Sequence, residues 1–340
     1  MNKLKEKKHF LGIDISQDTL DLALVNESSY GSYLDKKVEN SFSGFEQMFE
    51  WLQKKKVKFN DCLVCMEHTG TYGLLLFAWL SQIGVDYCVE PGLKIKRSLG
   101  LVRGKDDAID ARRIADFAYT NKEKLKIFQF PSTKIIQIKQ CLTYRDQMVK
   151  IKTSLKNSLK SHEKYQKVSG LKEIAARIAN QIEEQQKRID EIERQIKELI
   201  KSDEAIKKNF ELAKSVKGVG LVIGTFMLVT TNNFTGFENG RKYACYAGIA
   251  PFGFSSGTSI RGKTQVSTLG NKKIKALLSN GANSACRYDP EIRAYYKRKL
   301  EEGKNHKLII NAISCKLVNR VFAVVKRQTP YVITYQQKIA

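Results

Sequence analysis

Two short apolar stretches near the amino end decide the fold of this chain. Residues 9–16 read HFLGIDIS and residues 20–26 read LDLALVN. Both are apolar runs or alternations of strand length, and residues 33–39 continue the pattern. We therefore expect three consecutive strands that form the antiparallel part of a sheet.

Helices and strands alternate after these three strands. The pattern predicts helices at 45–55, 72–83 and 108–120, and strands at 62–67 and 85–89. Three strands followed by such an alternation predict an α/β sheet of mixed direction. The ribonuclease H-like nuclease fold has this order of elements.

The middle of the chain is expected to be helical, because no proline occurs between Pro131 and Pro251. A basic helix is predicted at about 134–160, and a heptad pattern begins at Leu171. One seam position holds Leu171, Ile178, Ile192 and Leu199 with Gln185 as the polar exception, and the other holds Ala175, Ile182, Ile189 and Ile196. The pattern suits a helical hairpin within one subunit and a coiled coil between subunits equally well.

The carboxyl-terminal part is expected to be mainly α. Helices are predicted at 272–288, 291–300 and 307–327, with a polar loop at 252–270. We expect three domains, which are an α/β catalytic domain at 1–130, a basic helical and coiled-coil linker at 131–203, and a carboxyl-terminal domain at 204–340.

Charge and composition exclude several classes of protein. The chain has 59 Lys and Arg against 35 Asp and Glu, a net charge of +24, and almost all of the excess lies after Pro131. Nucleic acid is the commonest partner of such a surface, and an acidic protein is the alternative. With 42% hydrophobic residues the chain is globular rather than disordered.

The cysteines and the apolar runs indicate a reduced, soluble protein inside the cell. Seven scattered cysteines do not suit a disulfide framework, and the lone pair Cys62 and Cys65 is expected to be a buried strand pair rather than a zinc or redox site. No signal peptide is visible, and the longest apolar run, 74–80, is too short to span a membrane.

Four acidic residues stand at matching ends of the predicted elements. Asp14 ends the first strand, Glu67 ends a later strand, and Asp107 and Asp110 share one face at the start of a helix. In a ribonuclease H-like sheet these positions converge, and Mg²⁺ is the natural ion for four oxygen donors, as one ion or as a pair. Each acid also has a structural alternative: Asp14 ends a strand, Glu67 is solvated, and Asp107 caps the helix.

Several motifs together make the sequence resemble a known family, the DEDD insertion-sequence transposases. The motifs are FLGIDISQDTLDLALV around Asp14, MEHTGTY around Glu67, GKDDAIDAR around Asp107 and Asp110, then KGVG and YAGIAPFGFSSGTSIRGKTQVSTLGN. The resemblance spans nearly the whole chain. It implies a RuvC-like amino-terminal domain and a carboxyl-terminal transposase domain that carries a serine.

The resemblance also implies roles for particular residues and partners. Asp14, Glu67, Asp107 and Asp110 would hold Mg²⁺ or Mn²⁺. Ser256 would be the nucleophile, with Ser255 as its adjacent competitor and Ser259 as a more distant one. The expected phosphate contacts are Lys105, Arg261 and Lys263. The expected partners are donor and target DNA, a non-coding bridge RNA that guides the enzyme, and further copies of the chain, as a dimer or tetramer with composite sites. The protein would work in the bacterial cytoplasm, at the nucleoid when bound to DNA.

The sequence departs from the family pattern at three positions. Asp106 stands where the family usually has Thr, so Asp106 is an alternative to Asp107 as the third carboxylate. Lys217 replaces the usual proline of the glycine turn, and Thr268 replaces a basic residue. With a working serine the protein is a recombinase. The alternatives are a RuvC-like endonuclease that uses water and a non-catalytic nucleic-acid-binding protein.

Overall fold

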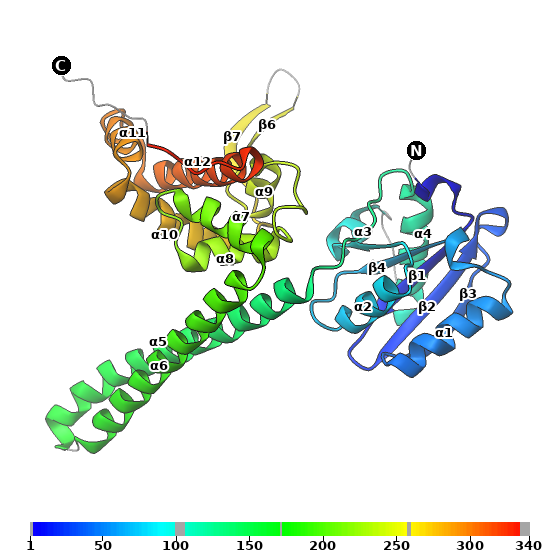
Figure 1. Ribbon diagram of the computed structural model, residues 1–340, viewed down its shortest axis with the longest axis horizontal. Helices are drawn as coiled ribbons and strands as arrows, with labels where there is room; N and C mark the ends of the chain where they lie inside the picture. The colour runs from blue at the N-terminus through cyan, green and yellow to red at the C-terminus, as the bar shows by residue number, and fades with distance from the viewer. Residues whose placement is uncertain (1–2, 99–105, 171, 257–259, 334–340) are drawn as a thin grey trace. The chain divides into compact units, whose positions relative to one another are not determined.

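The computed structural model describes residues 3–98, 106–170, 172–256 and 260–333. It divides into two compact units, residues 1–130 and residues 131–340, which are described separately here (Figure 1).

A five-stranded sheet forms the centre of the first unit. Its order is β3-β2-β1-β4-β5, with β1 (His9–Ile15), β2 (Thr19–Asn26), β3 (Leu34–Glu39), β4 (Cys62–Glu67) and β5 (Tyr87–Glu90). The first three strands are antiparallel, and β4 and β5 run parallel to β1. The predicted ribonuclease H-like order of strands in a sheet of mixed direction is therefore confirmed.

Helices cover both faces of this sheet because the strand residues alternate between two apolar clusters. The odd-numbered core residues of β1 pack with α1 (Phe42–Lys54) and α2 (Leu74–Gln82). Phe10 packs on the opposite face with α3 (Gly92–Ser98) and α4 (Asp107–Asn121). Helix α3 was not predicted. Three short 3₁₀ helices complete the unit, at Lys3–Glu6, Glu27–Ser29 and Phe59–Asp61.

A glycine in β1 sets how closely α4 approaches the sheet. A Cβ atom at Gly12 would lie 2.1 Å from the carbonyl oxygen of Ala111 and 2.4 Å from the amide nitrogen of Ala115. Such distances are far below van der Waals contact, so only glycine allows the two backbones to touch. This contact places the first turn of α4 beside the end of β1.

The second unit begins with two long helices that pack against each other as a hairpin. These are α5 (Thr133–Ser169) and α6 (Glu173–Lys201), and Figure 1 shows them running antiparallel. The heptad residues Ile189, Ile192 and Ile196 are buried, whereas Ile178 and Ile182 are half-buried. Leu171 lies outside the described residues. The hairpin is formed within one chain, and a coil between subunits stays a prediction.

The remaining helices enclose the carboxyl-terminal core. They are α7 (Glu204–Ser215), α8 (Leu221–Thr230), α9 (Gly240–Tyr246), α10 (Lys272–Tyr288), α11 (Pro290–Glu301) and α12 (His306–Arg327). Among the helices that the structure describes, α12 has the length and apolarity of a membrane span. Half of that apolar window is buried in this core, which is typical of a core helix.

The prediction of a loop at 252–270 is wrong for most of its length, because the chain forms a two-stranded hairpin there. Strand β6 (Pro251–Ser256) pairs with β7 (Ile260–Val266) in antiparallel register, with an irregularity between Phe252 and Phe254. The segment is rich in Ser, Gly and Thr and shows no apolar alternation. The two backbones pair along this register.

Candidate active site

The carboxylate side chains at the ends of β1 and β4 lie on the face that α4 covers. Asp14 shares the face of Phe10 and Gly12, and Glu67 shares the face of Leu63 and Cys65. These alternate residues point to one side because the side-chain period of a strand is two. The close contact at Gly12 then brings the first turn of α4 next to Asp14.

The four predicted acids act on one another electrostatically. The pKa of Asp14 is raised from 3.8 to about 6, first because burial disfavours its charged form and then because of the charges on Asp110, Asp107, Glu67 and Asp21. In the part of the chain that is described, neither Asp14 nor Glu67 forms an ion pair with Lys or Arg. Negative charge is therefore concentrated around Asp14, and the cations nearby pair with Asp110 and Asp21 rather than with Asp14 itself.

The three acids at the start of α4 have different positions and contacts. Asp106 is the N-cap and accepts a hydrogen bond from the amide of Ala108 at 3.4 Å. The alternative in which Asp107 caps the helix is therefore wrong, and Asp107 stands inside the first turn. Asp110 pairs with Arg113 at 2.6 Å.

Glu67 is positioned by a second glycine. A Cβ atom at Gly92 would lie 2.0 Å from Oε1 of Glu67, so any larger residue at the start of α3 would displace the carboxylate. Gly92 therefore gives Glu67 the room that it occupies at the end of β4.

Two further acids in the same region were missed by sequence reasoning. Asp21 lies directly opposite Asp14 across β1 and β2, and Glu90 lies opposite Glu67 across β4 and β5. Asp21 pairs with Lys37 at 3.0 Å, and Glu90 pairs with Lys94 at 2.8 Å. The strand pattern was visible in the sequence, but only the register shows which acids become neighbours.

The donor chemistry of this cluster suits a hard divalent cation. Carboxylate oxygens are the ligands that Mg²⁺ and Mn²⁺ favour, and a cation would relieve the repulsion that raises the pKa of Asp14. Within the described ranges, no three His, Cys, Asp or Glu side chains already lie at metal-binding spacing. Asp14, Glu67, Asp107 and Asp110 would therefore have to draw together around an ion.

The predicted serine lies near the tip of the β6–β7 hairpin in the second unit. Ser256 is the last residue of β6 and pairs with Ile260, and Ser255 pairs with Arg261. For Ser256 and Arg261 the structure describes the position of the backbone only. Lys263 is exposed on β7, and Lys105 and Ser259 lie outside the described residues.

The base of this hairpin is locked to the helices on either side. A Cβ atom at Gly270 would lie 2.2 Å from Cα of Gly248, so the two backbones touch where the hairpin leaves the core. The amide of Asn271 donates to the carbonyl of Tyr246 at 2.8 Å, and its side-chain amide donates to the Tyr246 hydroxyl at 2.9 Å. Asn271 also caps α10, accepting from Lys273 N at 3.1 Å.

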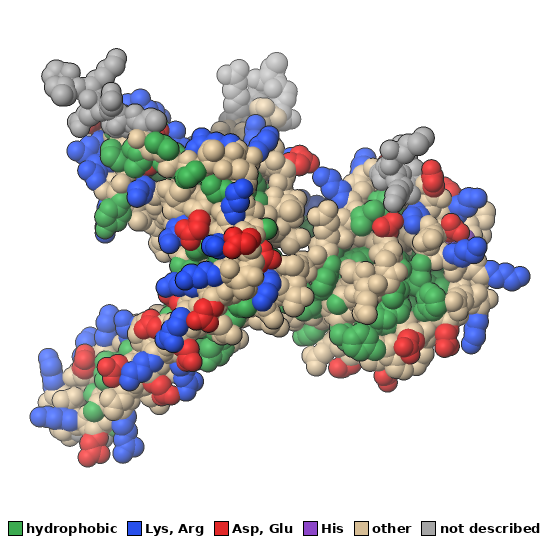
Figure 2. Space-filling view, in the orientation of Figure 1, with side chains coloured by type: hydrophobic (Ala, Val, Ile, Leu, Met, Phe, Trp, Pro, Cys, Tyr) green, Lys and Arg blue, Asp and Glu red, His purple; other side chains and the backbone are tan. Residues whose placement is uncertain are grey.

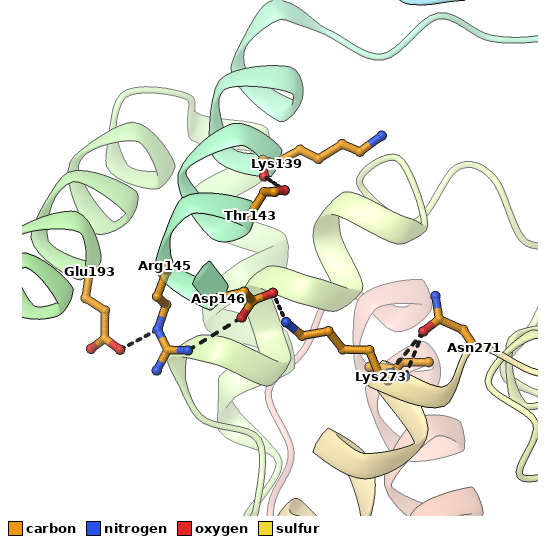
Figure 3. A network of polar contacts seen from close by, with 8 residues as sticks. Lys139, Thr143, Arg145, Asp146, Glu193, Asn271 and Lys273 are labelled. Atoms are coloured by element: carbon orange, nitrogen blue, oxygen red, sulfur yellow. Dashed lines mark hydrogen bonds and ion pairs between the residues drawn. The ribbon is translucent and has the colours of Figure 1, made fainter. Parts of the chain in front are cut away.

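A polar network connects this base to the two long helices (Figure 3). Arg145 on α5 donates to Glu193 on α6 at 2.7 Å and lies 3.9 Å from Asp146. Asp146 in turn pairs with Lys273 in the first turn of α10. Burial and the nearby Arg145 lower the pKa of Lys273. The network fixes the start of α10 relative to α5 and α6.

The glycine turn in KGVG is explained by packing. Gly218 has φ +95°, and a Cβ atom there would lie 2.4 Å from the carbonyl oxygen of Gly281 on α10. Both the left-handed backbone and the close approach require glycine.

The CxxC pair lies inside the first unit. Cys62 packs with the α1 and α2 cluster and Cys65 with the α4 cluster, on opposite faces of β4. Burial raises the pKa of the Cys62 thiol to about 12 and also raises that of Cys65. The two thiols therefore cannot converge on one metal ion in this strand.

Basic side chains are spread widely over the second unit. Figure 2 shows Lys and Arg side chains along α5 and α6 and around α11 and α12. In the first unit, basic and acidic side chains are nearly balanced. The excess positive charge of the chain is therefore a property of the unit that carries Ser256.

The fold and the acids together define a class of protein. A ribonuclease H-like sheet with acids at the ends of β1 and β4 and at the start of α4 is a RuvC-like domain with a DEDD carboxylate set. A family model described as "Transposase", for the DEDD transposases of the IS110 type, matches residues 11–164. A second, "Transposase IS116/IS110/IS902 family", matches residues 210–297. The chain belongs to the IS110 family of DEDD transposases, enzymes that cut and rejoin DNA.

Individual relatives extend this similarity over most of the chain. The "Pilin gene-inverting protein" of Moraxella bovis is 26% identical over 336 residues, which cover 95% of this chain and 98% of the relative. The "Insertion element IS110 uncharacterized 43.6 kDa protein" of Streptomyces coelicolor is 33% identical over 34% of this chain and 29% of its own length. The structure of Thermus thermophilus RuvC is 14% identical and covers 35% of this chain and 99% of RuvC, with a TM-score of 0.26.

Proposed function

We propose that this transposase cuts DNA by attack of the Ser256 hydroxyl on a phosphodiester, assisted by divalent metal held by Asp14, Glu67, Asp107 and Asp110. The observation that carries the proposal is the concentration of carboxylate charge around Asp14, whose pKa is raised to about 6. Strong perturbation by several neighbours of like charge is typical of functional sites.

The metal would supply two kinds of assistance. It would lower the pKa of the attacking hydroxyl and neutralise charge that develops on the phosphoryl oxygens. The four carboxylates would hold it, and Arg113 would have to release Asp110 or share it, because the two are paired at 2.6 Å. Mg²⁺ and Mn²⁺ both suit the donor set.

A serine nucleophile would preserve the energy of the DNA backbone. The hydroxyl oxygen forms a bond to phosphorus, and the bond from phosphorus to the leaving deoxyribose oxygen breaks, with a proton moving to that oxygen. The resulting phosphoserine ester can be attacked by a new DNA hydroxyl, which rejoins the strand without ATP. A relative named for inverting a pilin gene would need such cutting and rejoining.

We further propose composite sites, an RNA guide and work at the bacterial nucleoid. Acids in the first unit and serine in the second suit a homo-oligomer in which one subunit completes the site of another. The net charge of +24 suits binding to the phosphates of DNA and RNA, with Lys105, Arg261 and Lys263 as candidate contacts near the site. Base pairing by a bridge RNA would then choose donor and target DNA.

The test is to trap the covalent intermediate. The chain is expressed from a plasmid that carries the element with its flanking non-coding DNA, and protein–DNA adducts are isolated under denaturing conditions. Digestion and mass spectrometry should find a nucleotide on Ser256. The matched variants are Ser256→Ala, which should abolish the adduct, and Ser255→Ala, which should retain it.

Two outcomes would contradict the serine mechanism. DNA cutting that survives in Ser256→Ala would indicate an endonuclease that uses water. An adduct that disappears only in Ser255→Ala would move the nucleophile by one residue. Asp14→Asn should abolish cutting under either mechanism.

A further inference from the structure

Lys37 lies beside the carboxylate cluster on the face that α4 covers. The register places Lys37 opposite Asp21 on β2, and Asp21 opposite Asp14 on β1. With strands about 4.8 Å apart, Lys37 is two strands, or about 10 Å, from Asp14. The three residues therefore form one row that ends at the edge strand β3.

The ammonium group of Lys37 is held in place but not enclosed. Its Nζ lies 3.0 Å from Oδ2 of Asp21, whose side chain is only 12% exposed, while the side chain of Lys37 is 55% exposed. The hydrogen bond that Lys37 donates to Asp21 and the charge of Asp21 raise the pKa of Lys37, and the charges of Asp107 and Asp106 act in the same direction. An ammonium has three N–H donors, so two remain for a ligand after the bond to Asp21.

A neighbouring lysine of the first unit lacks this arrangement, and another shares part of it. Lys36 is the next residue on β3, but its side chain lies on the opposite face and donates to the carbonyl of Gln47 on α1 at 3.0 Å. Lys94, on the same face, pairs at 2.8 Å with Glu90, the neighbour of Glu67 across β4 and β5, but its ammonium also lies 5.7 Å from the ring of Phe117. The side chain of Lys37 is the more exposed of the two, at 55% against 49%.

We propose that Lys37 is a phosphate-binding residue of this site and that Asp21 positions it. Its ammonium contacts a non-bridging oxygen of a backbone phosphate near the phosphodiester that is cut. The inference rests on the proposed function, because it takes the DEDD acids to be the cutting site.

Metal binding and phosphate binding would support each other in this arrangement. Without a cation the acids repel a DNA backbone, and Lys37 neutralises only part of their charge. Once the acids hold a divalent ion, the phosphates meet a positive centre with Lys37 at its edge. The effect of Lys37 on DNA binding is therefore expected to be larger with the metal than without it.

The experiment measures how DNA binding depends on salt. Full-length protein, with any RNA that it retains, is titrated with a labelled duplex that carries one end of the element and its flanking host DNA. The buffer contains Ca²⁺ or EDTA, and electrophoresis confirms that the DNA stays intact. The variants are Lys37→Met, which keeps the aliphatic stem, Lys37→Arg, and the matched control Lys36→Met.

A lost phosphate contact has a defined signature. In Ca²⁺, Lys37→Met should lower the slope of log affinity against log salt by about one unit, with Lys37→Arg near wild type and Lys36→Met unchanged. Equal slopes for wild type and Lys37→Met, both folded by tryptophan fluorescence, would overturn the proposal and leave Lys37 as a counter-ion of Asp21. If the serine mechanism fails instead, Ser256→Ala still cuts while the slope change at Lys37 persists.

Discussion

Replacing Asp14 by Asn tests whether the carboxylate cluster is under electrostatic strain. In the folded chain the pKa of Asp14 is raised from 3.8 to about 6 by burial and by neighbouring acids. A raised pKa in the folded state means that its contribution to stability is fully present below about pH 4 and is lost as the pH rises through 6. Asn carries no charge, so the variant avoids this loss.

The magnitude follows from the shift. Each pKa unit corresponds to about 1.4 kcal/mol, so the full shift would correspond to about 3 kcal/mol. Asp14 is only partly buried, and solvent screening reduces this to about 1–2 kcal/mol. Asp14→Asn should therefore stabilise the first unit by that amount at pH 7 without metal and have little effect near pH 4.

The assay can follow the first unit alone. Both tryptophans of the chain, Trp51 and Trp79, lie in residues 1–130, so their fluorescence during urea unfolding reports on that unit. Unfolding is measured from pH 4 to pH 7 in EDTA and then with Mg²⁺. Wild type should gain stability with Mg²⁺, and the variant should gain much less, because a ligand stabilises only the state that binds it.

One result would refute the reasoning. If Asp14→Asn is no more stable than wild type at pH 7, and both lose the same free energy between pH 4 and pH 7, the acids do not repel one another as the structure implies. The metal arm of the assay is separate, because equal gains with Mg²⁺ in both proteins would remove Asp14 from the ligand set.

Two further substitutions test the packing behind each unit. Gly12→Ala should lower the free energy of unfolding of the first unit by about 2 kcal/mol or more, because its Cβ would overlap the α4 backbone. It should also lower the pKa of Asp14, because α4 and its acids would move away. Unchanged stability in urea would contradict this. Asp289 is fully buried and pairs with Arg320 at 2.8 Å. Asp289→Asn should therefore lower the free energy of unfolding of the second unit by about 3 kcal/mol, measured by circular dichroism. The more exposed partner Glu291 is the control, and an equal loss in Glu291→Gln would show that burial is not the cause.

The strands and acids of the first unit were predictable because burial leaves a strong pattern. The apolar alternation around Asp14 and Glu67 identified both strands, and their ends fixed where the acids would meet. Helix α3 was missed because its sequence, GLKIKRS, alternates apolar and basic residues and buries only Ile95. Short helices with one buried side chain carry almost no periodic signal.

Relations between strands were beyond the reach of the sequence. Nothing local indicates that Asp21 faces Asp14 or that Lys37 faces Asp21, because a shift of one residue in register would turn each side chain to the other face. The hairpin that carries Ser256 was likewise hidden, since its strands are held by backbone hydrogen bonds. The register partners of Asp14 and the hairpin around Ser256 therefore had a weak local signal, unlike the acids themselves.

The contact between the backbones of Gly248 and Gly270 has a consequence for how the length of the β6–β7 hairpin can vary. They close the hairpin at its root, and in the described part of β6 and β7 no side chain belongs to the apolar core. Residues added to or removed from both β6 and β7 in register would change how far Ser256 lies from the helices while leaving those helices undisturbed. The length by which the hairpin projects can therefore change independently of the stability of the helical core that supports it.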